Sequence, residues 1–246
     1  MKHPEKLLYV LFPNRCLFCY TVIGWNDHVC WQCRQDPPSM LPPLCPDCGR
    51  SESLCICGGR KRHYARCVTP LPYDKRLHDA VARLKIQGCS TTADGFAVEM
   101  EEVLRREYGG LPLDCVTPVP LHRKEQRSRG FNQAELLATR LAAWLGIPML
   151  PLLTKPYETL PQKELSASRR QGNLLGAFDV PEPAQAAGKT VLLVDDVITT
   201  GATLDECAKM LKLAGAAEVY AVTAAGTVPH ERNGSADDLQ NSSDGV

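Results

Sequence analysis

One stretch of the sequence constrains the fold more than any other: four apolar residues, Val191–Val194, followed at once by Asp195 and Asp196. Such a compact apolar run is typical of a strand buried on both faces, as in a parallel sheet covered by helices. A short loop and a helical pattern over 204–214 come next, and a second strand pattern covers 218–223. Strand, helix and strand of these lengths form a βαβ unit, so the sequence predicts an α/β fold with a parallel sheet and flanking helices.

The loop after the two acids has the composition of a phosphate-binding turn. Thr203 and Glu206 have the spacing of a capping box, which predicts a helix that starts at about Leu204. Its free N–H groups and the positive end of its dipole would then suit a phosphate monoester. The acids suit the vicinal hydroxyls of a sugar, directly or through Mg²⁺. Together they indicate a ribose phosphate, and an ordinary βα turn with solvated acids is the alternative. The candidate binding residues are Asp195, Asp196, Thr199, Thr200, Gly201, Ala202 and Thr203.

Two acids followed by Thr-Thr-Gly-x-Thr resemble the motif with which type I phosphoribosyltransferases bind 5-phosphoribosyl-1-pyrophosphate (PRPP). The resemblance implies a type I phosphoribosyltransferase-like fold, with Mg²⁺ bound together with PRPP. It also implies that Asp195 and Asp196 hold the ribose hydroxyls and that residues 199–203 hold the 5-phosphate.

A second, basic segment is expected at the same edge of the sheet. It follows a strand predicted over 113–119 and leads into a helix predicted over 132–145, which should end at Gly146. Four basic residues on a loop at the carboxyl end of a strand suit a pyrophosphate, although a solvated basic loop is the alternative. The candidate residues are Pro120, His122, Arg123, Lys124, Arg127, Arg129 and Gly130.

Eight of the 12 cysteines lie in four close pairs near the start of the chain. Each pair places two sulfurs on one tight turn, and two turns form a tetrahedral thiolate site. The four pairs therefore predict two Zn²⁺ sites, one from the first two pairs and one from the last two. Four thiolates leave no position for substrate, so each metal would be structural. The last pair is Cys-x-Cys, which makes the second site less secure; interleaved pairs, an iron–sulfur cluster and disulfides are the alternatives. The candidate ligands are Cys16, Cys19, Cys30, Cys33, Cys45, Cys48, Cys55 and Cys57, and buried thiols are expected at Cys67, Cys89, Cys115 and Cys207.

Over roughly residues 10–225, the order of these features resembles the ComF family of competence-associated proteins. The resemblance is carried by the paired cysteines, Arg83-Leu84-Lys85 before Gly88, the Arg-Gly-Phe-Asn-Gln run from Arg129, and Gln162-Lys163-x-Leu165-Ser166. It implies a double zinc ribbon joined to a phosphoribosyltransferase-like domain, with a part in DNA uptake or the use of external DNA. In relatives the 160s segment covers bound PRPP, which gives the lid candidates Gln162, Lys163 and Arg169; a polar connector is the alternative.

We therefore expect a zinc ribbon over 10–60, a phosphoribosyltransferase-like domain over 61–228 and a disordered tail over 229–246. The formal net charge is zero, but residues 1–90 carry an excess of basic residues. No run is long and apolar enough to cross a bilayer, and no secretion signal is present, so a cytoplasmic protein is expected.

Two functions fit the sequence. In the first, the chain binds PRPP without turnover while its ribbons contact single-stranded DNA or a helicase-like partner. The basic residues Arg60, Lys61, Arg62 and Arg66 are then the first candidates for DNA contact, with a solvated linker as the alternative. In the second, the chain is a Mg²⁺-dependent phosphoribosyltransferase of nucleotide metabolism. No acceptor group or catalytic residue can be identified from the sequence.

Overall fold

The computed structural model describes residues 13–87, 90–156 and 176–229. The lid candidates Gln162, Lys163 and Arg169 lie outside these ranges, as do Cys89 and all but the first residue of the expected tail.

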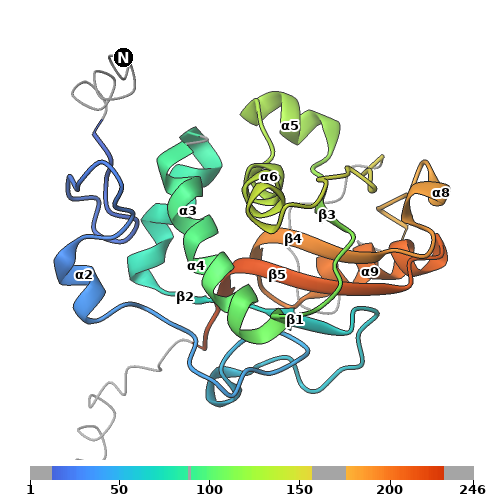
Figure 1. Ribbon diagram of the computed structural model, residues 1–246, viewed down its shortest axis with the longest axis horizontal. Helices are drawn as coiled ribbons and strands as arrows, with labels where there is room; N and C mark the ends of the chain where they lie inside the picture. Colours follow the sequence, from blue (N-terminus) through green and yellow to red (C-terminus); the bar gives the residue numbers. More distant parts are fainter. Residues whose placement is uncertain (1–12, 88–89, 157–175, 230–246) are drawn as a thin grey trace, which may run out of the picture.

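Five parallel strands form one sheet in the order β1-β5-β4-β3, with β2 pairing with β5 as well (Figure 1). The α/β prediction is confirmed. The two central strands extend further than expected, because they continue to pair with each other as far as Ile198 and Gly226. The strands are β1 Arg66–Val68, β2 Leu71–Tyr73, β3 Cys115–Pro118, β4 Thr190–Ile198 and β5 Glu218–Thr227.

Within the described residues, four longer helices flank the sheet. The sequence predicts two of them, over 132–145 and 204–214, and the helical spacing of Leu77, Val81 and Leu84 predicts a third. The helix predicted over 132–145 has Asn132 as its N-cap and ends at Gly146 in the left-handed conformation, φ 68°. The fourth, α4, was not predicted; Gly95 lies within it and leaves room for Leu17, 3.3 Å from where a Cβ would lie. The longer helices are α3 Lys75–Gln87, α4 Ser90–Tyr108, α6 Gln133–Leu145 and α9 Ala202–Leu213. The short ones are α2 Trp31–Gln35, α5 Arg123–Arg129, α8 Pro183–Ala186 and the 3-10 turn η1 Glu52–Leu54.

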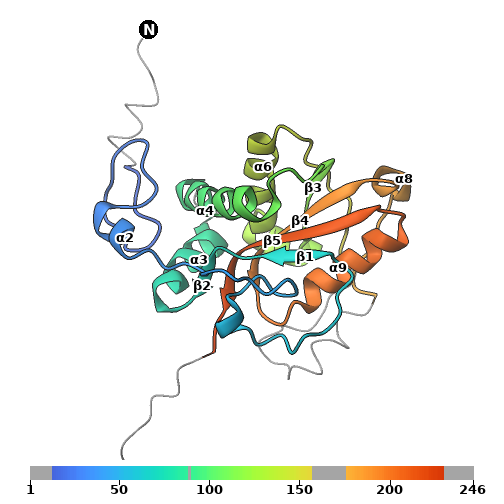
Figure 2. The same cartoon turned by 60° about the horizontal axis from the view of Figure 1, so that its bottom comes forward.

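The sheet separates two hydrophobic cores. Alternate residues of β4 point to opposite faces, so Leu192 and Val194 pack with α4 and α6, whereas Val191 and Leu193 pack with α9. Figure 2 shows α4 and α6 on one side of the strands and α9 on the other. No described helix is both long enough and apolar enough to span a membrane.

The cysteine-rich segments pack on opposite faces of this sheet. Leu17, Phe18 and Met40, from the first segment, belong to the core that contains α4 and α6. Cys45 and Cys48, from the second, belong to the core that contains α9. The cysteines of the two segments therefore belong to different cores, although Leu44 and Leu54 of the second segment also pack with the core that contains α4 and α6.

Candidate functional site

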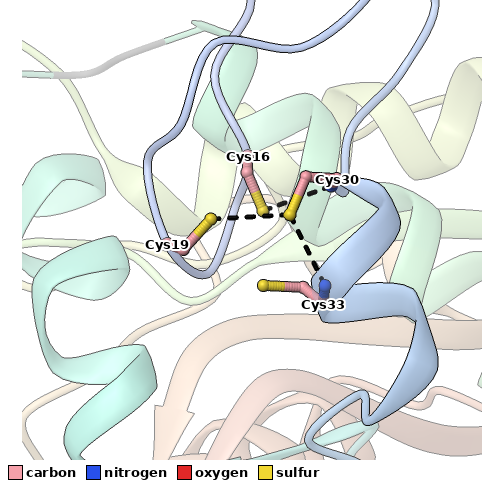
Figure 3. A group of neighbouring side chains, drawn as sticks. All are labelled: Cys16, Cys19, Cys30 and Cys33. Carbon is pink, nitrogen blue, oxygen red and sulfur yellow. Dashed lines mark hydrogen bonds between the residues drawn. The ribbon is translucent and has the colours of Figure 1, made fainter.

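The first cysteine cluster comprises Cys16, Cys19, Cys30 and Cys33, whose sulfurs point toward one another (Figure 3). The Sγ atoms of Cys19 and Cys30 are 3.5 Å apart. The backbone N–H groups of Cys30 and Cys33 donate to the sulfurs of Cys16 and Cys30, at 3.3 and 3.5 Å. Four zinc–sulfur bonds of about 2.3 Å in a tetrahedron separate the sulfurs by about 3.8 Å. The cluster therefore has the size and donor set for one metal ion.

The second cysteine cluster comprises Cys45, Cys48, Cys55 and Cys57, all with sulfurs within 4.8 Å of one another. Cys45 and Cys57 are 3.6 Å apart at Sγ, and Cys48 and Cys55 are 3.7 Å apart. The Cys-x-Cys pair thus completes a group of four neighbouring sulfurs, just as the Cys-x-x-Cys pair does in the first cluster. The structure groups the eight cysteines sequentially, as expected, with all eight as free thiols and without interleaving.

Outside the clusters, Cys67, Cys115 and Cys207 are fully buried, as predicted. Burial raises the pKa of the Cys115 thiol to about 11. These thiols therefore stay protonated at neutral pH and act as small apolar groups.

The carboxylate pair lies at the carboxyl end of β4 and meets a lysine from α3. The Nζ of Lys85 is 2.9 Å from an Oδ of Asp196. Burial, and after it the charge of Asp196, raises the pKa of Asp195 well above its ordinary value. Burial alone would lower the pKa of Lys85, but Asp196 outweighs it and the pKa is raised. Lys85 thus balances the charge of Asp196, while burial favours the protonated form of Asp195; bound Mg²⁺ or a hydroxyl donor would favour the carboxylate form of Asp195.

Residues 199–203, here called the phosphate loop, comprise the turn after β4 and the first two residues of α9. The predicted capping box is wrong. The helix starts at Ala202 with Gly201 as its N-cap at φ 77°, which puts Glu206 too far into the helix to reach back to the cap. Glu206 instead accepts a hydrogen bond from the backbone N–H of Gly176 at 3.1 Å. The amino end of α9 still opens into the loop.

Two arginines lie behind the phosphate loop. Arg50, which is fully buried, donates to the carbonyl oxygens of Ile198 and Thr199, at 2.9 and 2.6 Å. Arg62 donates to the carbonyl of Thr200 at 2.7 Å. Both guanidinium groups thus bind the backbone of the loop rather than its hydroxyl side chains.

The expectation that Arg62 and Arg66 lie free for DNA is wrong. The side chain of Arg62 is 4% exposed, because it is taken up by the phosphate loop and by Asp205, 3.9 Å away. Arg66 forms an ion pair with Glu107. Arg60 and Lys61 are exposed.

The basic segment after β3 lies next to the acid pair, since Pro118 is in register with Val194 and the N–H of Val119 donates to the carbonyl of Val194 at 2.8 Å. The expectation of a loop is wrong, because residues 123–129 form α5. His122 caps this helix and Gly130 ends it at φ 80°. The candidates split by exposure: residues 123–130 are exposed, whereas Pro120 and His122 are partly buried.

The residues that follow α5 join three elements. Asn132, which is buried, donates to the carbonyl of Val119 at 3.0 Å and caps α6. Gln133 donates to the carbonyl of Lys85 at 3.3 Å. These two amides fix the carboxyl end of β3 and the end of α3 beside the start of α6.

Comparison with known proteins agrees with this arrangement. Residues 128–241 match the family model described as phosphoribosyl transferase domain. The DNA utilization protein YhgH of Salmonella typhi is 36% identical, over 84% of this chain and 94% of the relative. Competence protein F of Haemophilus influenzae is 32% identical, over 85% of this chain and 95% of the relative. This chain belongs to the ComF family. Competence protein ComFC of Bacillus subtilis is 27% identical, over 76% of this chain and 78% of that protein.

Three residues at the site of this ComF-family chain were not assigned to it from the sequence: Lys85, Arg50 and Arg62. Lys85 could have been found from the sequence, since it lies in the last turn of an amphipathic helix and in the Arg-Leu-Lys run that carries part of the family resemblance. Arg50 lies between cysteine ligands and Arg62 just after them. Their contacts with the phosphate loop span 149 and 138 positions, so no local pattern reveals them.

Proposed function

We propose that this chain binds PRPP or a related ribose 5-phosphate between β4 and α9, and that it acts in the use of imported DNA. The observation that carries the proposal is the acid pair near the end of β4, followed after Val197 and Ile198 by the phosphate loop at the amino end of α9. The curated relatives named for competence and DNA utilisation support the second half. Reduced thiols in both clusters fit work in the cytoplasm.

The loop backbone explains the preference for a phosphate. In a trans peptide, the N–H of one residue points away from the carbonyl of the residue before it. Because Arg50 and Arg62 take the carbonyls of residues 198–200, the N–H groups of Thr199, Thr200 and Gly201 point away from the two arginines. These N–H groups, the Thr199, Thr200 and Thr203 hydroxyls and the dipole of α9 form the proposed 5-phosphate site.

The acid pair supplies the second half of the proposed site. Asp195 and Asp196 would accept hydrogen bonds from the 2- and 3-hydroxyls of the ribose. Mg²⁺, when bound, would neutralise the pyrophosphate of PRPP. Lys85 balances the charge of Asp196. The exposed basic side chains Arg123, Lys124 and Arg127 of α5 are our candidates to meet the pyrophosphate.

The two cysteine clusters are proposed to hold structural zinc. The Sγ separations, from 3.2 to 3.7 Å, lie somewhat below the tetrahedral value of about 3.8 Å, and each cluster offers four thiolates. Since four thiolates complete the coordination, the metal would stabilise the fold and take no part in chemistry.

The first cluster also carries the surface that we propose for single-stranded DNA. Trp31 on α2 is 72% exposed and Tyr20 is 40% exposed. The guanidinium groups of Arg15 and Arg83 lie 4.8 and 4.3 Å from the centre of the Tyr20 ring. Exposed rings beside cationic groups are what unpaired bases bind, by stacking and by charge. A helicase-like protein is the proposed partner for DNA handling.

Calorimetry with the zinc-loaded chain tests the proposal. Titration with Mg²⁺ and PRPP should show saturable binding, which Asp195→Asn and Asp196→Asn weaken. Asp79→Asn is the matched control, since Asp79 is 79% exposed on α3. No affinity for PRPP or ribose 5-phosphate at millimolar concentration would rule out the proposed site.

Turnover is measured in the same samples as release of pyrophosphate in the presence of a panel of bases and amines. Binding without release supports a role as a PRPP-binding protein. Release that both Asp→Asn variants abolish supports the second candidate, a phosphoribosyltransferase, which the basic α5 beside the acid pair favours.

A further inference from the structure

We propose that the second cysteine cluster positions the phosphate loop of the ribose-phosphate site. The contacts of Arg50 and Arg62 couple the conformation of this cluster to the conformation of the loop. The inference rests on the proposed function, to which it adds positioning residues that do not touch the ligand. It gives the two clusters different roles, since only the second governs the phosphate loop.

Arg50 joins the second cluster to the loop directly. Its backbone carbonyl accepts a hydrogen bond from the N–H of Cys45 at 2.8 Å, so the cysteine turn fixes where its side chain starts. One Nη donates to the carbonyls of Ile198 and Thr199 and to the hydroxyl of Thr227, the last at 3.0 Å. Nε donates to the carbonyl of Thr227. One buried side chain therefore connects the cluster with the ends of both central strands.

Arg62 and its neighbours make a second connection. Arg62 holds the carbonyl of Thr200, while Asp205 in the first turn of α9 accepts from the backbone N–H of His63 at 2.8 Å. The hydroxyl of Tyr64 donates to the carbonyl of Asp47, inside the Cys45–Cys48 turn. The same hydroxyl lies 3.3 Å from where a Cβ on Gly201 would lie. The segment just after the cluster thus touches both the cysteine turn and the phosphate loop.

The charges favour an anion on the open side of the loop. Every hydrogen bond that the Arg50 guanidinium makes within the described residues goes to a neutral oxygen. Its buried positive charge lies directly behind the loop carbonyls, and the loop N–H groups point the other way. A phosphate dianion in front of the loop would meet aligned N–H donors and a cation behind them.

A metal ion bound by Cys45, Cys48, Cys55 and Cys57 would hold the cysteine turn from which these side chains start. Cys45, Cys48 and Tyr64 belong to the same core as α9 and Cys67, and the N–H of Cys67 donates to the carbonyl of Pro46 at 2.8 Å. Without an ion, only weak sulfur–sulfur contacts would join the four thiols. The turn would loosen where it supports Arg50. The first cluster lies on the opposite face of the sheet and makes no such contact among the described residues.

The first test replaces Arg62 with Gln, with Arg76→Gln as the matched control. Arg76 is 48% exposed, and among the described residues its guanidinium contacts only Asp36 and Asp74. Hydrogen exchange of the backbone N–H groups over 199–205 is measured without ligand, and ribose 5-phosphate affinity by calorimetry. Arg62→Gln should speed exchange at least tenfold and weaken binding at least tenfold, and Arg62→Lys, which keeps one donor, should recover part of both. Arg76→Gln should change neither.

The second test removes one ligand from each cluster. Cys57→Ser and Cys19→Ser should each lower the bound zinc from two ions to one, measured by a colorimetric chelator. Only Cys57→Ser should speed exchange over 199–205. If Cys57→Ser fails to fold, the Arg62 variants decide alone.

The outcomes separate the inference from the proposed function. Unchanged loop exchange in Arg62→Gln, or equal effects of Cys19→Ser and Cys57→Ser on the loop, overturns the inference. A wild-type protein that binds no ribose phosphate overturns the proposed function, whereas faster loop exchange in the same Arg62→Gln sample still supports control of the loop by the cluster.

Discussion

The phosphate loop depends on the absence of one side chain, and Gly201→Ala tests that dependence. Gly201 has φ 77°, and a Cβ there would lie 3.3 Å from an Nη of Arg62 and 3.3 Å from the hydroxyl of Tyr64. A non-glycine residue in this left-handed region costs about 1–2 kcal/mol. For a chain of this size that loss lowers the melting temperature by about 2–8 °C. The added methyl group must also push Arg62 away from the carbonyl of Thr200.

Gly188→Ala separates these two effects. Gly188 has φ 70°, but nothing lies within 4 Å of its added Cβ. Both variants should therefore lose similar stability in thermal unfolding, whereas only Gly201→Ala should weaken ribose 5-phosphate binding. We expect a loss of about tenfold, which corresponds to about 1.4 kcal/mol. Equal affinities of the two variants, measured by calorimetry well below their melting temperatures, would refute the reasoning that Arg62 and Tyr64 shape the loop.

Three further predictions concern other parts of the site. The raised pKa of Asp195 means that the folded protein keeps a proton that the unfolded chain loses near pH 4. Stability from this group is present below that pH and is lost as the pH rises through the raised pKa, so Asp195→Asn should gain stability relative to wild type over that range in urea titrations. Asn132→Ala removes the cap of α6 and the bond to Val119, and should cost about 0.5–2 kcal/mol in the same titrations; a variant as stable as wild type would contradict the described contacts. Trp31→Ala should weaken binding of a fluorescent oligothymidine by about 1–3 kcal/mol if a base stacks there, without altering ribose 5-phosphate affinity.

The sequence predicted those parts of the fold whose signals are local. The apolar run before Asp195 and the helix between Asn132 and Gly146 carry their own strand pattern and caps, and both were located correctly. Local evidence was available but misjudged for α5. Its basic residues were interpreted by charge alone, although Arg, Lys, Glu and Gln are also strong helix formers and His122 supplies a cap.

The candidate site was predicted in its chemistry but not in its supports. The acid pair and the threonine-rich loop are adjacent in the chain, so their roles could be proposed from their order. Lys85 reaches Asp196 from another helix, and Arg50 and Arg62 reach the loop from the far end of the sequence. Such contacts depend on the order of the strands in the sheet, which cannot be deduced from the hydrophobic periodicity of the sequence. Arg62 was interpreted as a surface residue because its partner in the phosphate loop, Thr200, lies 138 positions further along the chain.

The strand order β1-β5-β4-β3 has a consequence for how the protein is made. β1 leaves the ribosome long before β5, the strand with which it pairs. Likewise, 177 further residues must be synthesised after Arg50 before its partner Thr227 is present. Contacts so distant along the chain make folding slow, because the closure of a large loop precedes any gain. If the cysteine clusters hold zinc as proposed, both early segments could bind their ions while translation continues. A nascent chain would thus carry a metal-organised start that docks only when the last strand arrives.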